Sequence, residues 1–262
     1  MAYALSLSRG APSATRPPLR EEQTPNNKVA LWQVWMWGQQ RLFADGLATV
    51  RGQAYAPYMN KITLHKGDLP AGLDLGRIVA VDTEAMGLNP VRDALCVVQL
   101  SSGDGTAHVV QLERGYKCPN LKALLADEEI LKIFHFARFD VAMMKKWLGI
   151  TCTPVWCTKI ASKLARTYTD RHGLKDVTRE LIGANMDKSQ QSSDWGAAEL
   201  TDQQLQYAAS DVLHLHEIRA GLNAMLAREG RVELAQACFE FLPIRADLDL
   251  QGWDETDIFA HS

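Results

Sequence analysis

Residues 77–90 read RIVAVDTEAMGLNP, and this stretch decides the fold that we expect. Ile78 to Val81 form a short apolar run that leads into a Gly/Asn/Pro turn, a pattern typical of a buried β-strand. Since alternate residues of a strand point to the same side, Asp82 and Glu84 should project together from one face. Two carboxylates at the end of a buried strand are costly unless a cation compensates them. The stretch therefore predicts a site for a hard metal ion.

A third carboxylate comes from the middle of the chain. Residues 132–140 read KIFHFARFD, in which the apolar pair Ile133–Phe134 has the character of a strand. The residues that follow, VAMMKKWLGI, have a helical period, so Asp140 should lie in the first turn of a helix that comes after a strand.

The fourth carboxylate belongs to a late helix. Residues 200–218 read LTDQQLQYAASDVLHLHEI, with apolar residues at helical spacing and Thr201 or Asp202 as the candidate N-cap. Tyr207 and Asp211 are four residues apart, so they should lie one turn apart on the same helical face. The pattern predicts a phenol beside a carboxylate.

Four acidic side chains from one strand and two helices suit a pair of Mg²⁺ or Mn²⁺ ions, because these ions prefer oxygen ligands. Two such ions stabilise the attacking and leaving oxygens of a phosphoryl displacement, and a nearby tyrosine can orient the attacking water. The residues thus indicate phosphodiester hydrolysis. The candidate catalytic residues, of which the four acids are the candidate metal ligands, are Asp82, Glu84, Asp140, Tyr207 and Asp211.

These motifs resemble those of the DEDD 3′–5′ exonuclease superfamily in its tyrosine-bearing branch. A closer resemblance, from about residue 59 to 262, is to the short ribonuclease D homologues called nanoRNase C, and segments such as LNPVRDALCVVQLSSGDG, FHFARFD and QQSSDW carry it. The resemblance implies an α/β, RNase H-like (DnaQ-like) fold. It also implies an exoribonuclease that converts short single-stranded RNA, dinucleotides in particular, to 5′-mononucleotides, and a homo-oligomer such as an octameric ring.

The resemblance also indicates residues that would bind the substrate. Leu88 occupies the position at which dinucleotide-cleaving relatives place a leucine between the two bases, and an apolar plug under the turn is an equal alternative. His135, beside the site, is a further candidate for substrate binding, although a histidine in this position is more often a hydrogen-bonded core residue than a ligand. Two loops border the site if the helices pack as in relatives. Each of their polar residues could bind a 5′-phosphate of the substrate or could be a solvated loop residue. These residues are Arg166, Arg171, Lys188, Ser192 and Ser193.

The charge of the chain bears on substrate length. Its net charge is −3, whereas a long, sequence-independent nucleic-acid footprint needs many basic contacts. We therefore expect a short substrate held by the metals and a few cations. Two alternatives stay open: a ribonuclease D-like exonuclease that processes longer RNA, such as tRNA 3′ ends, or DNA; and a nucleic-acid-binding module without catalysis, against which the retention of all four acids and Tyr207 argues.

The five cysteines form no Cys-x-x-Cys pair. An odd set without metal-ligand spacing argues against a structural zinc site or a disulfide framework. Free thiols fit a reducing compartment, so we expect a cytoplasmic protein.

The first 58 residues differ from the rest. Residues 8–27 are rich in Ser, Pro and Arg without a period, and the apolar stretch 29–47 is too short and interrupted to span a bilayer. We expect residues 1–58 to be an N-terminal extension, disordered or preceding a native start at Met59, and no membrane partner. Residues 59–262 would form the exonuclease domain.

Within that domain the periodicity predicts a meander of strands followed by alternating helices and strands, which makes a mixed sheet flanked by helices with the Asp82 strand at its centre. The expected strands are 62–65, the strand that begins at Ile78 and carries Asp82 and Glu84, 94–100, 107–112 and 130–135. The expected helices are 120–126, 140–148, 157–165, 174–183, 201–228 and 233–241.

Overall fold

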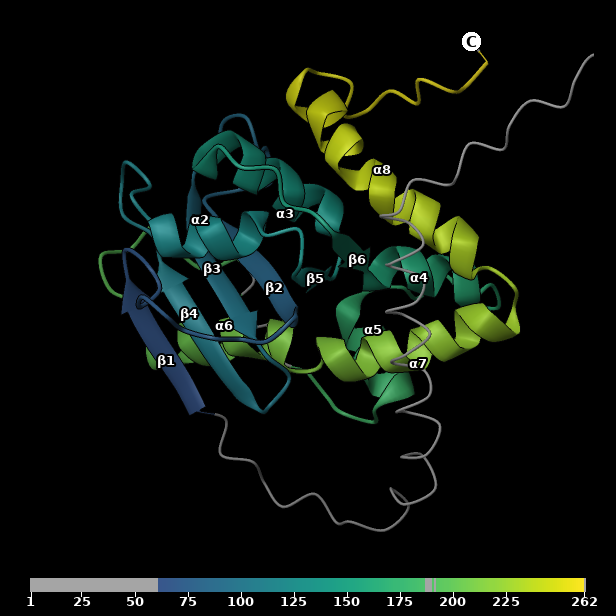
Figure 1. Cartoon of the computed structure of the whole chain (residues 1–262), viewed down its shortest axis with the longest axis horizontal. Coiled ribbons are helices and arrows are strands. Elements are labelled where there is room, and N and C mark those ends of the chain that lie inside the picture. The colour runs from purple at the N-terminus through teal and green to yellow at the C-terminus, as the bar shows by residue number, and fades with distance from the viewer. Residues whose placement is uncertain (1–60, 187–189, 191, 262) are drawn as a thin grey trace, which may run out of the picture. The chain divides into compact units, whose positions relative to one another are not determined.

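One six-stranded mixed sheet forms the centre of the molecule (Figure 1). The computed structural model describes residues 61–186, 190 and 192–261, so the predicted extension 1–58 and its boundary at Met59 lie outside the described residues. The strand order is β1-β4-β3-β2-β5-β6. The strands are β1 (Lys61–Lys66), β2 (Ile78–Ala85), β3 (Leu95–Ser101), β4 (Thr106–Gln111), β5 (Leu131–Phe134) and β6 (Val155–Cys157).

Helices follow the strands in the predicted order. They are α2 (Pro119–Ala126), α3 (Ala137–Met143), the π-helix η1 (Met144–Leu148), α4 (Thr158–Ala165), α5 (Leu174–Leu181), α6 (Asp202–Leu213), α7 (Leu215–Arg228) and α8 (Val232–Leu250). The predicted α/β architecture, a mixed sheet flanked by helices, is therefore confirmed.

Strand β2 lies inside the sheet, as the sequence predicts. It pairs antiparallel with β3 and parallel with β5, and β3 pairs antiparallel with β4, which completes the predicted meander. Val79, Ala80 and Val81 have no exposed surface. An uninterrupted apolar run is what a strand covered on both faces requires.

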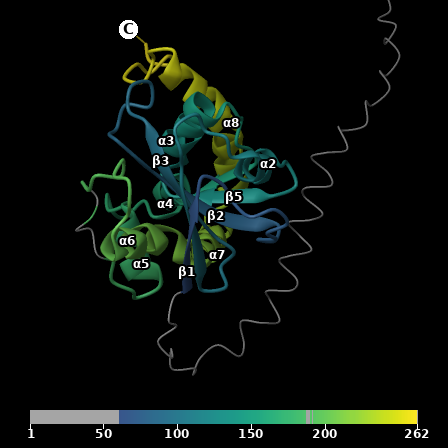
Figure 2. The same cartoon turned by 90° about the vertical axis from the view of Figure 1, so that its left-hand side faces the viewer.

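The two faces of the sheet carry different helices. Figures 1 and 2 show α2 and α6 on opposite faces. Helix α6 contacts β1 to β4, whereas α3 packs mainly against α8 and α4 against α7. The helix with Tyr207 and Asp211 therefore lies directly against the strand with Asp82 and Glu84.

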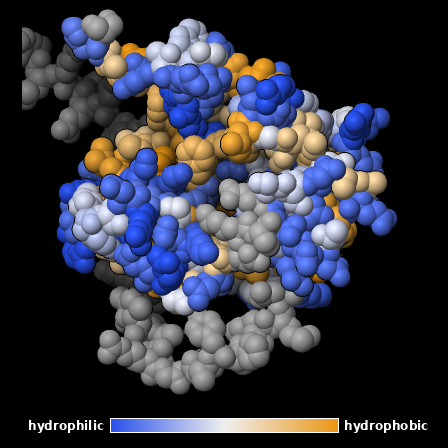
Figure 3. Space-filling view, turned by 180° about the vertical axis from the view of Figure 1, so that it is seen from behind, coloured by the Kyte–Doolittle hydropathy of each residue, from blue (hydrophilic) through white to orange (hydrophobic). Residues whose placement is uncertain are grey.

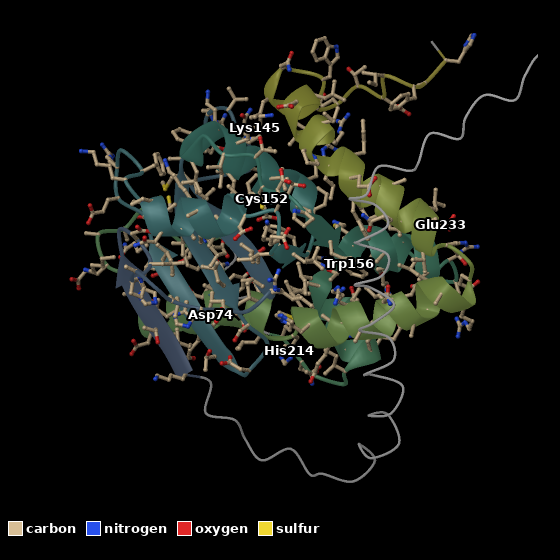
Figure 4. All side chains as sticks on the ribbon, in the orientation of Figure 1. Asp74, Lys145, Cys152, Trp156, His214 and Glu233 are labelled. Carbon is tan, nitrogen blue, oxygen red and sulfur yellow. The ribbon has the colours of Figure 1, made fainter. Side chains whose placement is uncertain are left out.

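The predicted long helix 201–228 is wrong in one respect, because it is two helices that meet at His214 (Figure 4). The chain there contains no glycine or proline to mark the interruption. The two helices pack against different partners, α6 against the sheet and α7 against α4. Nε2 of His216 also lies 3.1 Å from the carbonyl oxygen of Ile78.

Two further differences concern short or interrupted patterns. Strand β6 has three residues, too few to show a period, and the helix predicted from Cys157 begins at Thr158. Helix α8 runs to Leu250 through Pro243, beyond the predicted end. Its second half is held by contacts that the local sequence does not reveal, namely ion pairs of Asp247 with Lys145 and of Asp249 with Arg138.

The face seen in Figure 3 is largely hydrophilic, and apolar patches lie between its hydrophilic areas. Among the described helices, none is both long and apolar enough to cross a bilayer. All five cysteines are free, and four of them are buried.

Candidate active site

Three of the predicted acids converge. One ligand oxygen each of Asp82, Glu84 and Asp211 lies within 4.8 Å of the others. Asp82 and Glu84 share a face of β2 because they are two residues apart on the strand. Asp211 reaches them because α6 packs against β2 and β3. The cluster thus forms where a strand and a helix that are distant in sequence cross.

Asp140 is not one of these three, but it lies near enough that its charge repels those of Asp82 and Glu84. It lies in the first turn of α3, as predicted, and is 3% exposed. The hydroxyl of Thr83 donates a 2.6 Å hydrogen bond to its Oδ1. Thr83 therefore links the fourth acid to β2, between Asp82 and Glu84. No motif in the sequence indicates a role for this threonine.

Gln99 is a second residue that the sequence analysis missed. It pairs with Asp82 across β2 and β3, and its Nε2 donates a 2.7 Å hydrogen bond to Oδ2 of Asp82. Gln99 has no exposed surface. A buried amide that orients a ligand carboxylate has the geometry of an outer-shell partner in a metal site. A glutamine inside the apolar run LCVVQL was the signal that could have revealed it.

Tyr207 is fixed by the start of α6 and the loop before it. Thr201 and Gln204 form a capping box, which confirms Thr201 as the N-cap. The side chain of Gln204 also donates to the carbonyl oxygen of Asp194, at 3.0 Å. This anchors the neighbouring Trp195, which is 2% exposed and whose ring centroid is 6.0 Å from that of Tyr207.

The electrostatics of the cluster favour a cation. Burial, with added repulsion from Asp211 and Asp140, raises the pKa of Glu84 to about 9. Burial raises the pKa of Asp140 to about 7, and burial followed by the neighbouring carboxylates raises the pKa of Asp82 well above its ordinary range. Buried carboxylates crowded in this way are compensated by a bound cation, and an all-oxygen donor set suits a hard divalent ion. The residues present therefore fit Mg²⁺ or Mn²⁺.

The phenol of Tyr207 keeps its proton in this environment. Burial raises its pKa, and the charges of Asp211, Glu84 and Asp82 raise it further. A protonated phenol is a hydrogen-bond donor and a poor base. Its chemistry at the site is accordingly that of orienting a water or substrate oxygen.

Two of the predicted substrate residues lie on elements that adjoin the acids. Leu88 is 89% exposed in the turn that follows β2. His135 follows β5, and its Nδ1 is 2.8 Å from the hydroxyl of Thr158, which itself donates to the carbonyl oxygen of Phe134. The Thr158 hydroxyl thus lies within hydrogen-bond distance of both the imidazole and the backbone of β5. The hydrogen-bonded interpretation of His135 therefore agrees with the structure.

The predicted phosphate-binding residues differ in accessibility. Arg166 has no exposed surface, and its guanidinium donates to Glu180, to the hydroxyl of Ser162 and to the carbonyl oxygen of Arg171. Its donors are used within the protein, so the expectation that it grips substrate is corrected here to a structural role. Arg171 is exposed.

The other loop is described only in part. Ser192 is exposed and Ser193 half-buried, with the Ser193 hydroxyl 3.3 Å from Oε1 of Gln190. Lys188 lies outside the described residues.

Comparisons with known proteins agree with this geometry. Residues 68–227 match the family described as 3′-5′ exonuclease. Ribonuclease D of Acidiphilium cryptum is 35% identical over 155 residues, which are 59% of this chain and 39% of that protein. The chain thus spans about two fifths of the length of this curated relative.

Solved structures match over a larger share of the chain. Brucella melitensis NrnC bound to pGG is 56% identical, with a TM-score of 0.75, and the match covers 78% of this chain and all of the other. NrnC with bound Mg²⁺ gives 56% identity and a TM-score of 0.74. Escherichia coli RNase D is 26% identical with a TM-score of 0.58, over 65% of this chain and 45% of that one.

Proposed function

The chain belongs to the 3′–5′ exonuclease family, as a short homologue of ribonuclease D, and from this premise we propose that it hydrolyses short RNA, dinucleotides in particular, to 5′-mononucleotides. The observation that carries the proposal is the convergence of Asp82, Glu84 and Asp211, with Asp140 and Tyr207 beside them.

The preference for short substrates draws support from the comparisons and from charge. The NrnC structure bound to pGG matches over its full length. The net charge of −3 also disfavours a long phosphate footprint. The proposed enzyme acts in the cytoplasm, where its five free thiols are stable.

Each residue has a proposed part in the reaction. Asp82, Glu84, Asp140 and Asp211 would hold two divalent ions. When bound, such ions stabilise charge on the attacking and leaving oxygens of a phosphoryl displacement. The phenol of Tyr207 would orient the attacking water toward the last phosphodiester linkage, and Gln99 and Thr83 would hold two of the acids in place. The product would be a nucleoside 5′-monophosphate.

A substrate-length series tests this proposal. Single-turnover rates in Mg²⁺ would be measured on 5′-phosphorylated RNAs of two to seven nucleotides, and on DNA of the same lengths. The dinucleotide should be cleaved fastest. Fastest cleavage of the longest RNA would favour ribonuclease D-like processing instead, and no hydrolysis of any substrate would favour a binding module.

Assembly is tested on the same sample. We propose a homo-oligomer, such as an octameric ring. Support comes from exposed apolar side chains on α8 and the residues after it, which are Leu234, Phe241, Ile244, Trp253, Ile258 and Phe259. Size-exclusion chromatography with light scattering should give a mass several times that of the chain, and a monomeric mass would contradict the proposal.

Tyr207→Phe tests the role of the phenol, since it removes only the hydroxyl. The single-turnover rate on the dinucleotide should fall by about 10²-fold, with little change in binding. Tyr116→Phe is a control, because the Tyr116 hydroxyl donates to the carbonyl oxygen of Leu95 rather than toward the acids. An unchanged rate in Tyr207→Phe would remove Tyr207 from the mechanism.

A further inference from the structure

The turn between β2 and β3 exposes Leu88, and hydrogen bonds within the turn hold its backbone. Leu88 is 89% exposed, whereas Asp93, at the far end of the turn, is 8% exposed. The backbone N–H of Asn89 donates to Oδ2 of Asp93 at 3.0 Å, and the N–H of Asp93 donates to the carbonyl oxygen of Asn89 at 2.8 Å. The residue after Leu88 is thus bonded twice to Asp93.

Other bonds close the turn around the same carboxylate. Arg92 donates to both oxygens of Asp93, at 2.6 and 2.9 Å. The side-chain Oδ1 of Asn89 accepts from the N–H groups of Val91 and Arg92, at 2.9 and 3.2 Å. A carboxylate that accepts several charge-assisted and backbone bonds fixes the local backbone more firmly than neutral pairs do.

Two further contacts show how little freedom the turn has. A Cβ built on Gly87 would overlap the carboxylate of Asp93, so the glycine leaves the space that this side chain fills. Trp147 donates from Nε1 to the carbonyl oxygen of Pro90 at 3.1 Å. Trp147 belongs to η1, which continues the helix that carries Asp140. The turn is therefore tied to the metal-ligand helix as well as to β2.

We propose that Asp93 is a positioning residue for Leu88, and that it sets the affinity for a dinucleotide by holding the turn so that Leu88 meets the substrate bases. The inference rests on the proposed function and on the expectation, drawn from the family resemblance, that Leu88 contacts the substrate bases. An apolar side chain inserted against base faces gains more net binding energy when its backbone is already ordered, because ordering the backbone on binding costs conformational entropy.

A double-mutant cycle tests the inference on the full chain with pGG as substrate and Mg²⁺ present. Leu88→Ala and Asp93→Asn should each raise KM by about 10-fold while kcat changes by less than about 3-fold, as expected for lost binding. The KM of the double variant should be no higher than that of Leu88→Ala alone, because Asp93 acts through Leu88. Asp93→Asn keeps the shape and one acceptor, which preserves the fold better than alanine would.

Asp104→Asn is the matched control. Asp104 caps the β3–β4 turn at the other end of the sheet, where its Oδ1 accepts from the N–H and hydroxyl of Thr106 at 2.9 and 2.7 Å. Its KM should equal that of the wild type. Gly87→Ala should reproduce the Asp93→Asn effect without changing any polar group, because its Cβ displaces the same carboxylate.

Several results separate the inference from the proposed function. An unchanged KM in Asp93→Asn, or effects of the two substitutions that multiply in the double variant, would overturn the inference while the wild type stays active. A wild type that does not cleave pGG would instead overturn the proposed function. Hydrogen exchange gives a readout without activity: the amides of Asn89, Val91 and Arg92 should exchange about 10-fold faster in Asp93→Asn, and unchanged exchange would also overturn the inference.

Discussion

Single residues at the site carry an electrostatic cost that a bound cation would offset. Glu84 and Asp211 come from different elements, yet oxygens of both lie in one cluster with Asp82. Like charges at this separation destabilise the fold until a cation is bound. Loss of one acid should therefore affect activity and metal-free stability in opposite directions.

Asp211→Asn should abolish hydrolysis, with a rate at least about 10³-fold lower, because a metal ligand is lost. In EDTA the variant should be more stable than wild type by roughly 1 kcal/mol, since repulsion is relieved. The measurements are mononucleotide release in Mg²⁺ and thermal unfolding in EDTA. Asp202→Asn, an exposed aspartate on the same helix, should keep its activity. Turnover at the wild-type rate in Asp211→Asn would refute the site assignment.

Gln99→Leu tests whether a buried amide tunes the metal site. It removes the donor to Asp82 and keeps the buried volume similar. The Mg²⁺ concentration for half-maximal activity should rise by about 10-fold or more. Ser101→Ala removes another buried polar group of β3, bonded to the carbonyl oxygen of Thr106, and should leave the Mg²⁺ dependence unchanged. Equal Mg²⁺ titrations for Gln99→Leu and wild type would show that Gln99 only fills space.

Among the secondary-structure elements, the segment between α4 and α5 shows why two arginines of one loop differ. Arg166 is buried and bonded to Glu180, a residue of α5, so it joins the two helices. Arg171 lies on the surface of the same loop. A substitution of Arg166 should therefore affect the stability of the fold, whereas a substitution of Arg171 should affect substrate binding.

Arg166→Met should lower the free energy of unfolding by about 2 kcal/mol, because several buried hydrogen bonds are lost. Arg171→Ala should leave the melting temperature unchanged and raise KM by about 10-fold for a 5′-phosphorylated dinucleotide, but not for the same dinucleotide with a 5′-hydroxyl. Chemical denaturation and steady-state kinetics on the two substrates check both halves. An Arg171→Ala enzyme with unchanged KM on both would be consistent with a solvated loop residue.

At the scale of the whole molecule, the sequence divides at Met59 in our prediction, and the family match begins at residue 68. A chain that starts at Met59 should keep full activity and thermal stability, because the preceding residues lack a pattern that would share the core. The two chains would be compared by pGG hydrolysis and by thermal unfolding. An insoluble or inactive shorter chain would show that residues 1–58 belong to the working protein.

Local patterns in the chain are sufficient to predict the central strand, the meander around it and the approximate place of each acid. These features rest on local periodicity: an apolar run followed by Asp82 and Glu84, a strand-to-helix transition before Asp140, and the four-residue spacing of Tyr207 and Asp211. Such patterns depend on neighbouring residues alone, so they can be read without the fold.

The side chains that support the acids, and the accessibility of the candidate residues, become visible in the folded chain alone. Gln99 bonds Asp82 across two strands, Thr83 bonds Asp140 across a strand and a helix, and Arg166 is buried by contacts with α5. The break at His214 likewise reflects the different packing partners of α6 and α7. These outcomes depend on contacts between residues far apart in the chain, and no local period encodes them because burial and hydrogen-bond partners are set by packing.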